Sequence, residues 1–485
     1  FLRQTPRVSQ AKGWRYKGML EQIDQIIKVI DGAVWGLPLI ILILFTGFLL
    51  TTRLGLLQIR HLGKALKFMF KNEEDGQGEV TSFGALCTAL SATIGTGNIT
   101  GVATALAAGG PGALFWMVIA AFFGMATKYA EGLLAIKYRT IDKDGHVLGG
   151  PFYYIENGMG KNWRWLAKIF AFFGAGVGLF GIGTFTQVNG ITSAANNFFD
   201  PNNAHMISLF GRDYSWSVVI AGLILAICVG LVVIGGLKRI SQVSQVVVPF
   251  MAVIYVIAAI TILICNITKI PGAFVTIIQS AFGMRAAAGG ALGAVLLAMQ
   301  KGIARGIFSN EAGLGSAPIA AAAAQVEEPA RQGLISMMGT VIDTLVICTM
   351  TGLCIVITGA WDMGLEGVSV TDKAFRMGLP LPNQLCSFIL MICLVFFAFT
   401  TILGWDYYSE RCLEYLCGGK LKVVKVYRWI YILAIFIGPY MTVSAVWTIA
   451  DIFNGLMAIP NLIALVALSG VVVAETKIYF DGLKK

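Results

Sequence analysis

Charged side chains are scarce in this sequence: Asp, Glu, Lys and Arg together make up 13% of its 485 residues. Soluble globular domains carry about 25% charged residues, so the composition excludes an ordinary soluble protein. Hydrophobic residues reach 57% and gather in runs long enough to cross a bilayer. The sequence therefore predicts an all-α integral membrane protein without a separate soluble domain.

Residues that commonly carry catalysis are few as well. The three histidines, His61, His146 and His205, fall in predicted connections between spans. The sequence contains no His-Glu-x-x-His zinc motif, no Walker phosphate loop and no Gly-x-Ser-x-Gly elbow. The nine cysteines show no disulfide or zinc spacing. These absences disfavour a membrane-embedded enzyme, and we expect no organic cofactor. A channel is disfavoured too, because no repeated filter sequence or ring-forming set of carboxylates is present.

Hydropathy in a window of about 19 residues predicts eleven transmembrane spans. They cover approximately residues 35–52, 82–108, 112–137, 166–198, 216–236, 244–268, 286–325, 332–359, 385–408, 427–448 and 455–475. The long connections are 53–81, 138–165 and 360–384, and the last of them has room for a short interfacial helix.

Basic residues concentrate in the odd-numbered connections, so the positive-inside rule places those connections and the C-terminus in the cytoplasm and the N-terminus outside. The net charge of +10 is attributed to these loops rather than to nucleic-acid binding. Residues 1–18 are polar and basic, which does not suit an external tail. We interpret them as non-native or upstream sequence before a natural start at Met19, with a native basic tail of a processed chain as the alternative.

Two of the predicted spans are interrupted by glycines and polar residues. The first break lies within Ser91–Val102 and the second within Ile307–Ser316. Gly95 and Gly97 each weaken a helix by about 1 kcal/mol relative to alanine. Backbone leaves the helix inside a bilayer only where it is buried in protein or lines a cavity. Two interrupted spans at corresponding positions of two halves are the best sequence indication of a transporter's substrate site.

The positions of the breaks predict an internal repeat. With the first span set aside, ten spans divide into five and five, and a broken span opens each half. Because five is odd, the halves have opposite topology, as an inverted repeat requires. The predicted organisation is an N-terminal extra helix with its connection (19–81), two five-helix repeats (82–268 and 286–475) and a cytoplasmic tail (476–485).

Four stretches then resemble the signatures of one family: Gly97–Ala105, Gly109–Met117, Gly149–Ile155 and Ser309–Ala317. They are similar to the alanine or glycine:cation symporters, also called sodium:alanine symporters, which have the leucine-transporter-like (LeuT-like) fold. The resemblance implies a plasma-membrane carrier that couples Na⁺ to small neutral amino acids such as alanine and glycine by alternating access. The alternative within transporters is a proton-coupled carrier of the same fold, with Glu311 or Asp343 as the proton carrier.

A zwitterionic substrate needs donors for its carboxylate and acceptors for its ammonium. A half-helix that starts after Gly97 would direct N–H groups at the carboxylate, with Gly95, Thr96 and Asn98 beside it. The ammonium acceptors would be carbonyls near Ile307 and Phe308 and the side chain of Ser309 or Asn310. Two aromatic residues, Phe308 and Trp405, either form a wall of the pocket or only pack between helices. Thr96 and Asn98 either bind the substrate or join neighbouring helices. Gln187 either reaches the pocket or bridges two helices.

The resemblance also implies a sodium site between two spans. The side chains of Thr400 and Thr401 and the carbonyl of Phe397 would face the carbonyls of Ser91 and Ile94. The alternative is that both threonines bond back to their own helix.

Glu311 is an acid near the predicted membrane centre, which by default indicates a function. We favour a structural role, in which Glu311 orders the unwound segment that contains Gly313, over cation binding or proton transfer. Arg305, about one turn outward, is predicted to be a gate partner or to pair with a carboxylate. Asp343, Asp406 and Lys301 are embedded as well.

Overall fold

The computed structural model describes residues 25–27, 29–71, 76–142, 145–209, 212–284, 290–441 and 443–482. The interpretation of residues 1–18 therefore lies outside the described residues. In chain order the helices are α2 (Leu37–Arg53), α3 (Leu57–Arg60), α4 (Leu62–Phe70), α5 (Ser82–Thr93), α6 (Val102–Gly109), α7 (Gly112–Lys137), α8 (Pro151–Gly158), α9 (Arg164–Phe180), α10 (Phe185–Phe199), α11 (Trp216–Val233), α12 (Gly236–Cys265), α13 (Ile270–Ala281), α14 (Ala291–Asn310), α15 (Ala317–Ala322), α16 (Pro329–Thr340), α17 (Thr349–Thr358), α18 (Val368–Gly378), α19 (Asn383–Leu416), α20 (Leu421–Ile437), α21 (Val443–Ala467) and α22 (Ser469–Gly482).

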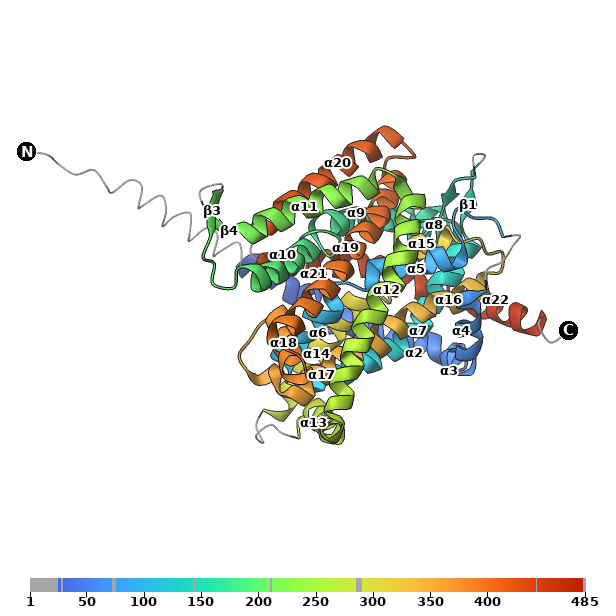
Figure 1. The fold of residues 1–485 in the computed structure, drawn as a ribbon. Coiled ribbons are helices and arrows are strands. Elements are labelled where there is room, and N and C mark those ends of the chain that lie inside the picture. Colours follow the sequence, from blue (N-terminus) through green and yellow to red (C-terminus); the bar gives the residue numbers. More distant parts are fainter. Residues whose placement is uncertain are drawn as a thin grey trace, which may run out of the picture.

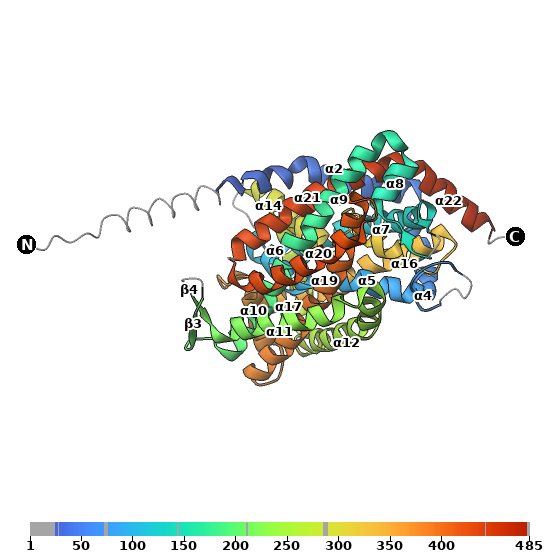
Figure 2. The same ribbon diagram turned by 90° about the horizontal axis from the view of Figure 1, so that it is seen from above.

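The structure also contains two π-helical segments, two hairpins and four short 3-10 helices, η2 (Lys161–Trp163), η3 (Ile267–Lys269), η5 (Ala360–Asp362) and η6 (Gly438–Tyr440). The π-helices are η1 (Gly97–Gly101), which leads into α6, and η4 (Val341–Cys348), which joins α16 to α17. Strand β1 (Thr140–Ile141) pairs antiparallel with β2 (Val147–Leu148), and β3 (Met206–Leu209) pairs antiparallel with β4 (Arg212–Ser215). Figures 1 and 2 both place β3 and β4 at one end of the bundle, and α4, α8 and α22 at the opposite end, which we call the β1–β2 end.

The prediction of about eleven spans is confirmed. Ten helices among the described residues are long and apolar enough to cross a membrane. The remaining span is the first broken one, whose helices α5 and α6 are each too short to cross alone. Helix α18 lies in the connection 360–384, where the sequence left room for a short helix. Large apolar side chains on α11, α12 and α20 are exposed on the outside of the bundle, as membrane-spanning helices require.

Several spans differ from the prediction in their boundaries or in their continuity. The span predicted at 166–198 is interrupted at Gly181–Thr184 between α9 and α10, and the span predicted at 332–359 contains η4. The spans predicted at 427–448 and 455–475 are observed as α20 and α21, so α21 begins and ends earlier. The cause of this shift is Pro439, which lacks the N–H that would continue α20. Averaged hydropathy does not detect such a turn.

The centre of the bundle consists of the broken helices and their supports. Helix α7 packs against α14, α15 and α16, whereas α19 packs against α5, α9, α10 and α12. The two breaks therefore lie between α7 on one side and α19 on the other. This packing positions the candidate site.

Candidate functional site

The first break separates α5 from η1 and is shaped by glycines. Helix α5 ends at Thr93, and Ile94 is extended with ψ of 94°. A Cβ atom added at Gly95 would lie 2.4 Å from Thr401 Oγ1, and one at Gly97 would lie 3.2 Å from Ser309 Cα. Glycine at these two positions thus allows α19 and α14 to approach the broken backbone.

Side-chain amides satisfy the backbone that the first break frees. Asn98 Oδ1 accepts the Gly95 N–H at 2.8 Å, and Gln187 Oε1 accepts the Thr96 N–H at 3.0 Å. Gln187 itself donates to the Ile182 carbonyl at 2.9 Å. The hydroxyl of Thr96 is buried and has no hydrogen-bond partner among the described residues. Gln187 therefore does reach this break, from α10.

The second break is held by two buried carboxyl groups. Glu311, in a left-handed conformation with φ of 57°, accepts from Trp405 Nε1 at 2.8 Å and from Ser316 Oγ at 2.6 Å. Glu131 of α7 accepts the N–H groups of Gly313 and Gly315 at 3.1 and 3.2 Å. Both glycines have positive φ, 90° and 80°, where a side chain would be strained.

The sequence reasoning did not identify Glu131, although an acidic residue inside a predicted span was a usable signal. Trp405 is buried with its indole on Glu311, and Asn461 of α21 donates to Glu131 at 2.8 Å. The segment Glu311–Ser316 is thus fixed from α7, α19 and α21.

The two breaks meet at Asp343 in η4. Asn98 Nδ2 donates to Asp343 Oδ1 at 2.7 Å, and Ser309 Oγ donates to the same oxygen at 3.1 Å. Thr344 Oγ1 donates to Oδ2 at 2.7 Å, and Asn310 Nδ2 donates to Thr344 Oγ1 at 3.0 Å. The donors to this fully buried carboxyl are neutral groups, from both breaks and from η4 itself.

The residues of the predicted sodium site divide into two sets. Thr401 Oγ1 lies 3.2 Å from the Ile94 carbonyl and 3.0 Å from the Phe397 carbonyl, so these three groups come together. Thr400 Oγ1 also donates to carbonyls of its own helix, at 3.0 Å for Phe397, and lies 3.5 Å from Met251 Sδ. Both threonines thus bond back to α19, and of the two only Thr401 also bonds to Ile94 among the described residues. Ser91 Oγ donates back to Thr88 within α5.

A large cavity of about 880 Å³ lies on the side of the two breaks that faces β3 and β4. Its floor contains Arg305, which pairs with Asp451 through two hydrogen bonds of 3.0 and 2.5 Å. The guanidinium lies 4.9 Å from the Trp447 ring centre and 5.5 Å from that of Phe308. Phe308 is buried beneath Trp447, with ring centres 4.9 Å apart. Arg305 thus pairs with a carboxylate, one of the two roles predicted for it.

The β1–β2 end is closed by polar contacts around Arg139 and His146. Arg139 donates at 2.7 Å to four backbone carbonyls, those of Gln77, Ala322, Ala324 and Val326.

Next to it, His146 lies 3.1 Å from Glu79, just before α5, and 3.1 Å from Glu414 of α19. The carboxylates of Glu414 and Glu79 raise the pKa of His146 to about 9. A positively charged imidazole therefore joins the start of α5 to α19 at neutral pH.

Comparisons with known proteins agree with this architecture. The family model described as the sodium:alanine symporter family matches residues 20–485. An uncharacterized transporter of Haemophilus influenzae is 54% identical over 95% of this chain and 97% of its own. The sodium/alanine symporter AgcS of Methanococcus maripaludis is 47% identical over 95% of this chain and 98% of its own. The crystal structure of MhsT in complex with L-phenylalanine superposes with a TM-score of 0.54 at 13% identity, covering 83% of this chain and 99% of that one.

The fold is LeuT-like and that of a multi-pass membrane protein, and the family match with its relatives makes the class of protein a secondary active transporter. The chain belongs to the sodium:alanine symporter family. The resemblance stated from the four sequence motifs is thereby confirmed.

Proposed function

We propose that this protein moves small neutral amino acids, alanine and glycine, together with Na⁺ across the cell membrane by alternating access. The observation that carries the proposal is the meeting of the two helix breaks at Asn98, Ser309 and Asp343, below the floor of the large cavity. The N-terminus is assigned to the outside and the β1–β2 end to the cytoplasm. In this arrangement the large cavity is the external entrance.

The polar groups around the junction support a position for the substrate. The free hydroxyl of Thr96 and the helix start at Gly97 are assigned to the carboxylate end. Asn98, whose amide bonds to Gly95 and Asp343, holds them in place. Ser309 and Asn310, beside the negative Asp343, are assigned to the ammonium end together with the carbonyls at the end of α14. Gln187 supports this geometry through Thr96, and Phe308 separates the substrate from the cavity floor.

The sodium position is assigned to the contact between Ile94 and α19. A hard cation prefers oxygen ligands, and the carbonyls of Ile94 and Phe397 already lie around the Thr401 hydroxyl. Thr400 and the Ser91 carbonyl complete the predicted set. A cation at this place would bridge α5 to α19 and order the broken helix, which would raise the affinity for the amino acid. By linkage, the amino acid must then raise the affinity for Na⁺ by the same factor.

A proton-coupled carrier is the second candidate, and Asp343 favours it. Its carboxyl is buried, accepts hydrogen bonds from neutral donors and has no ion pair with Lys or Arg among the described residues. A carboxyl in that setting is suited to carry a proton.

Uptake of radiolabelled alanine into proteoliposomes tests both candidates. We expect an inward Na⁺ gradient, at fixed pH and membrane potential, to drive accumulation that glycine and serine block and leucine does not. If only a pH gradient drives uptake, the proton-coupled alternative replaces the proposal. If alanine is not taken up under either gradient, the substrate assignment is wrong.

A further inference from the structure

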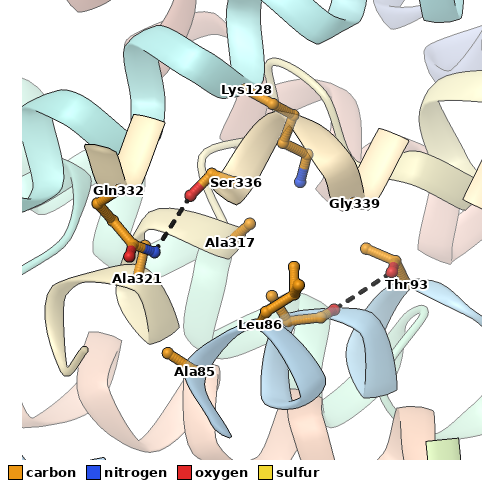
Figure 3. A pocket seen from close by; sticks show the side chains of 10 residues that line it. Ala85, Leu86, Thr93, Lys128, Ala317, Ala321, Gln332, Ser336 and Gly339 are labelled. Atoms are coloured by element: carbon orange, nitrogen blue, oxygen red, sulfur yellow. Dashed lines mark hydrogen bonds between the residues drawn. The ribbon is translucent and has the colours of Figure 1, made fainter. Parts of the chain in front are cut away.

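Lys128 of α7 is a buried lysine with an unusual environment. Its side chain is 2% exposed, and no hydrogen bond or ion pair to its ammonium is found among the described residues. Figure 3 shows the ammonium pointing into a small cavity beside Thr93 and Ser336. The cavity has a volume of about 10 Å³, which suits about one water molecule. Basic side chains inside a membrane protein ordinarily pair, so this isolation requires an explanation.

Three buried carboxyl groups interact with Lys128 at longer range. Glu131 lies three residues further along α7 and therefore on the same helix face. The ammonium interacts electrostatically with Glu131, with Glu311 in the second break and with Asp343 in η4. The phenols of Tyr154 and Tyr408 also face these carboxyls.

The other walls of the small cavity are neutral. Helices α5, α15 and α16 contribute to them only apolar side chains, hydroxyls, an amide and a glycine. Lys128 is thus the one basic group that lines this cavity, and its charge acts on the carboxyls only at longer range.

We propose that Lys128 is a positioning residue for transport, the fixed internal cation that stabilises the ionised forms of Glu131 and Glu311. These two carboxyls hold the segment Glu311–Ser316 through the N–H groups of Gly313 and Gly315 and the indole of Trp405. Two carboxylates in a low-dielectric interior repel each other and need a countercharge to stay ionised. Lys128 provides that charge without taking their hydrogen-bonding oxygens. The effect of Lys128 on uptake rests on the proposed transport function, whereas its electrostatic effect on the two carboxyls does not.

The position of Lys128 also links this balance to the transport cycle. The small cavity lies at the junction of α5 and α15, the helical halves on the β1–β2 side of the two breaks. Separation of these halves would admit water around the ammonium and weaken its effect on both carboxyls, because water screens charge. The second break would then loosen as the β1–β2 end opens.

Lys128→Met tests the proposal because it keeps the apolar stem and removes the charge. At pH 7.5 we expect alanine uptake to fall by about tenfold or more, since a buried charge loses its partner. Uptake should recover towards pH 5.5, because protonation of Glu131 or Glu311 replaces the missing cation. Lys128→Arg should retain uptake, and the pair Lys128→Met with Glu131→Gln should restore most of it at pH 7.5.

The matched control is Lys137→Met at the end of the same helix. Lys137 is 40% exposed in its side chain and pairs with Glu475 at 2.9 Å, so its loss should leave the pH profile unchanged. A Lys128→Met protein with reduced uptake but the wild-type pH profile would overturn the proposal. So would a double variant that is no more active than the single one.

Thermal unfolding of the purified proteins gives a readout that does not depend on the substrate. Lys128→Met should be less stable than wild type at pH 8, with the difference reduced at pH 6 and in the double variant. If Lys128→Met does not fold, the double variant should still yield folded protein, and its failure to do so also overturns the proposal. Absence of alanine uptake by the wild type would count against the proposed function alone, because the unfolding comparison remains.

Discussion

Thr400 and Thr401 are neighbours in α19, yet their hydroxyls have different partners. Thr401 faces the Ile94 carbonyl across the first break, whereas Thr400 faces Met251 and its own helix. We therefore expect Thr401→Ala to raise the Na⁺ concentration for half-maximal uptake by about tenfold, which corresponds to about 1.4 kcal/mol. Thr400→Ala should cause a smaller increase, and the pair should weaken Na⁺ activation most. Uptake measured as a function of Na⁺ concentration gives both values.

Thr401→Ser is the matched control for this prediction, because it keeps the hydroxyl and removes only a methyl group. It should retain a Na⁺ dependence close to that of the wild type. An unchanged Na⁺ dependence in the Thr400→Ala/Thr401→Ala variant would show that the ion site lies elsewhere.

Single residues differ in how far the sequence could predict them. Glu311 was expected to order its segment, and the structure places its carboxyl on Trp405 and Ser316. Glu131 and Lys128 were missed, because they lie in a long apolar span whose average hydropathy conceals two charges. A search for charged residues three positions apart within a span would have found them. Trp405 as a pocket wall stays a prediction.

At the scale of elements, the contact of α5 with α19 at the β1–β2 end depends on the charge of His146. The carboxylates of Glu414 and Glu79 raise the pKa of His146 to about 9. The stabilisation that the charged imidazole gives to this contact is therefore complete below the ordinary pKa of histidine and is lost as the pH rises through about 9. Arg411, which donates to Glu414 at 2.7 Å, lies beside the imidazole and remains charged throughout. We expect His146→Gln to speed hydrogen exchange at Glu79 and Val80, whose N–H groups bind the Ala323 carbonyl.

Hydrogen exchange followed by mass spectrometry at pH 7 and at pH 10 measures this effect. The two proteins should differ at pH 7 and converge at pH 10, after correction for the intrinsic exchange rate. His205→Gln, which changes a histidine next to β3 at the opposite end, is the control. Equal exchange in His146→Gln and wild type at pH 7 would contradict the prediction.

The sequence predicts an element well where the length of an apolar run determines the span. It does not predict an element where a local turn determines where the helix ends. The two broken spans were found because glycine and polar residues interrupt an apolar run, and both breaks are observed. The break at Gly181–Thr184 was missed, although Gly181 and Gly183 precede the polar Thr184. The π-helix η4 was missed because its sequence, Val341–Cys348, reads as a regular helix apart from Asp343. Packing against both breaks, rather than local preference, selects its conformation.

For the whole molecule, the assignment of sides makes a prediction about access. The large cavity should face the cell exterior, and Ala108 lies in its wall, whereas Ala321 lines the small cavity. In a background without the exposed Cys228 and Cys265, we expect Ala108→Cys in whole cells to react with a membrane-impermeant maleimide and Ala321→Cys not to react. Fluorescence of the labelled protein after gel electrophoresis measures this. Labelling of Ala321→Cys alone would reverse the orientation that the basic loops predict.

The contacts of Arg139 have a consequence for how freely this end of the molecule can vary. All four of its acceptors are backbone carbonyls. The hydrogen bonds therefore depend on the backbone conformation and not on the identity of the side chains at 77, 322, 324 and 326. Substitutions that leave this conformation intact should be tolerated at the exposed Gln77, whereas packing also restricts the buried Ala322, Ala324 and Val326. Lysine cannot replace Arg139, because a single ammonium lacks the planar fork that serves four acceptors at once. At this end, Gln77 should therefore tolerate substitution and Arg139 should not.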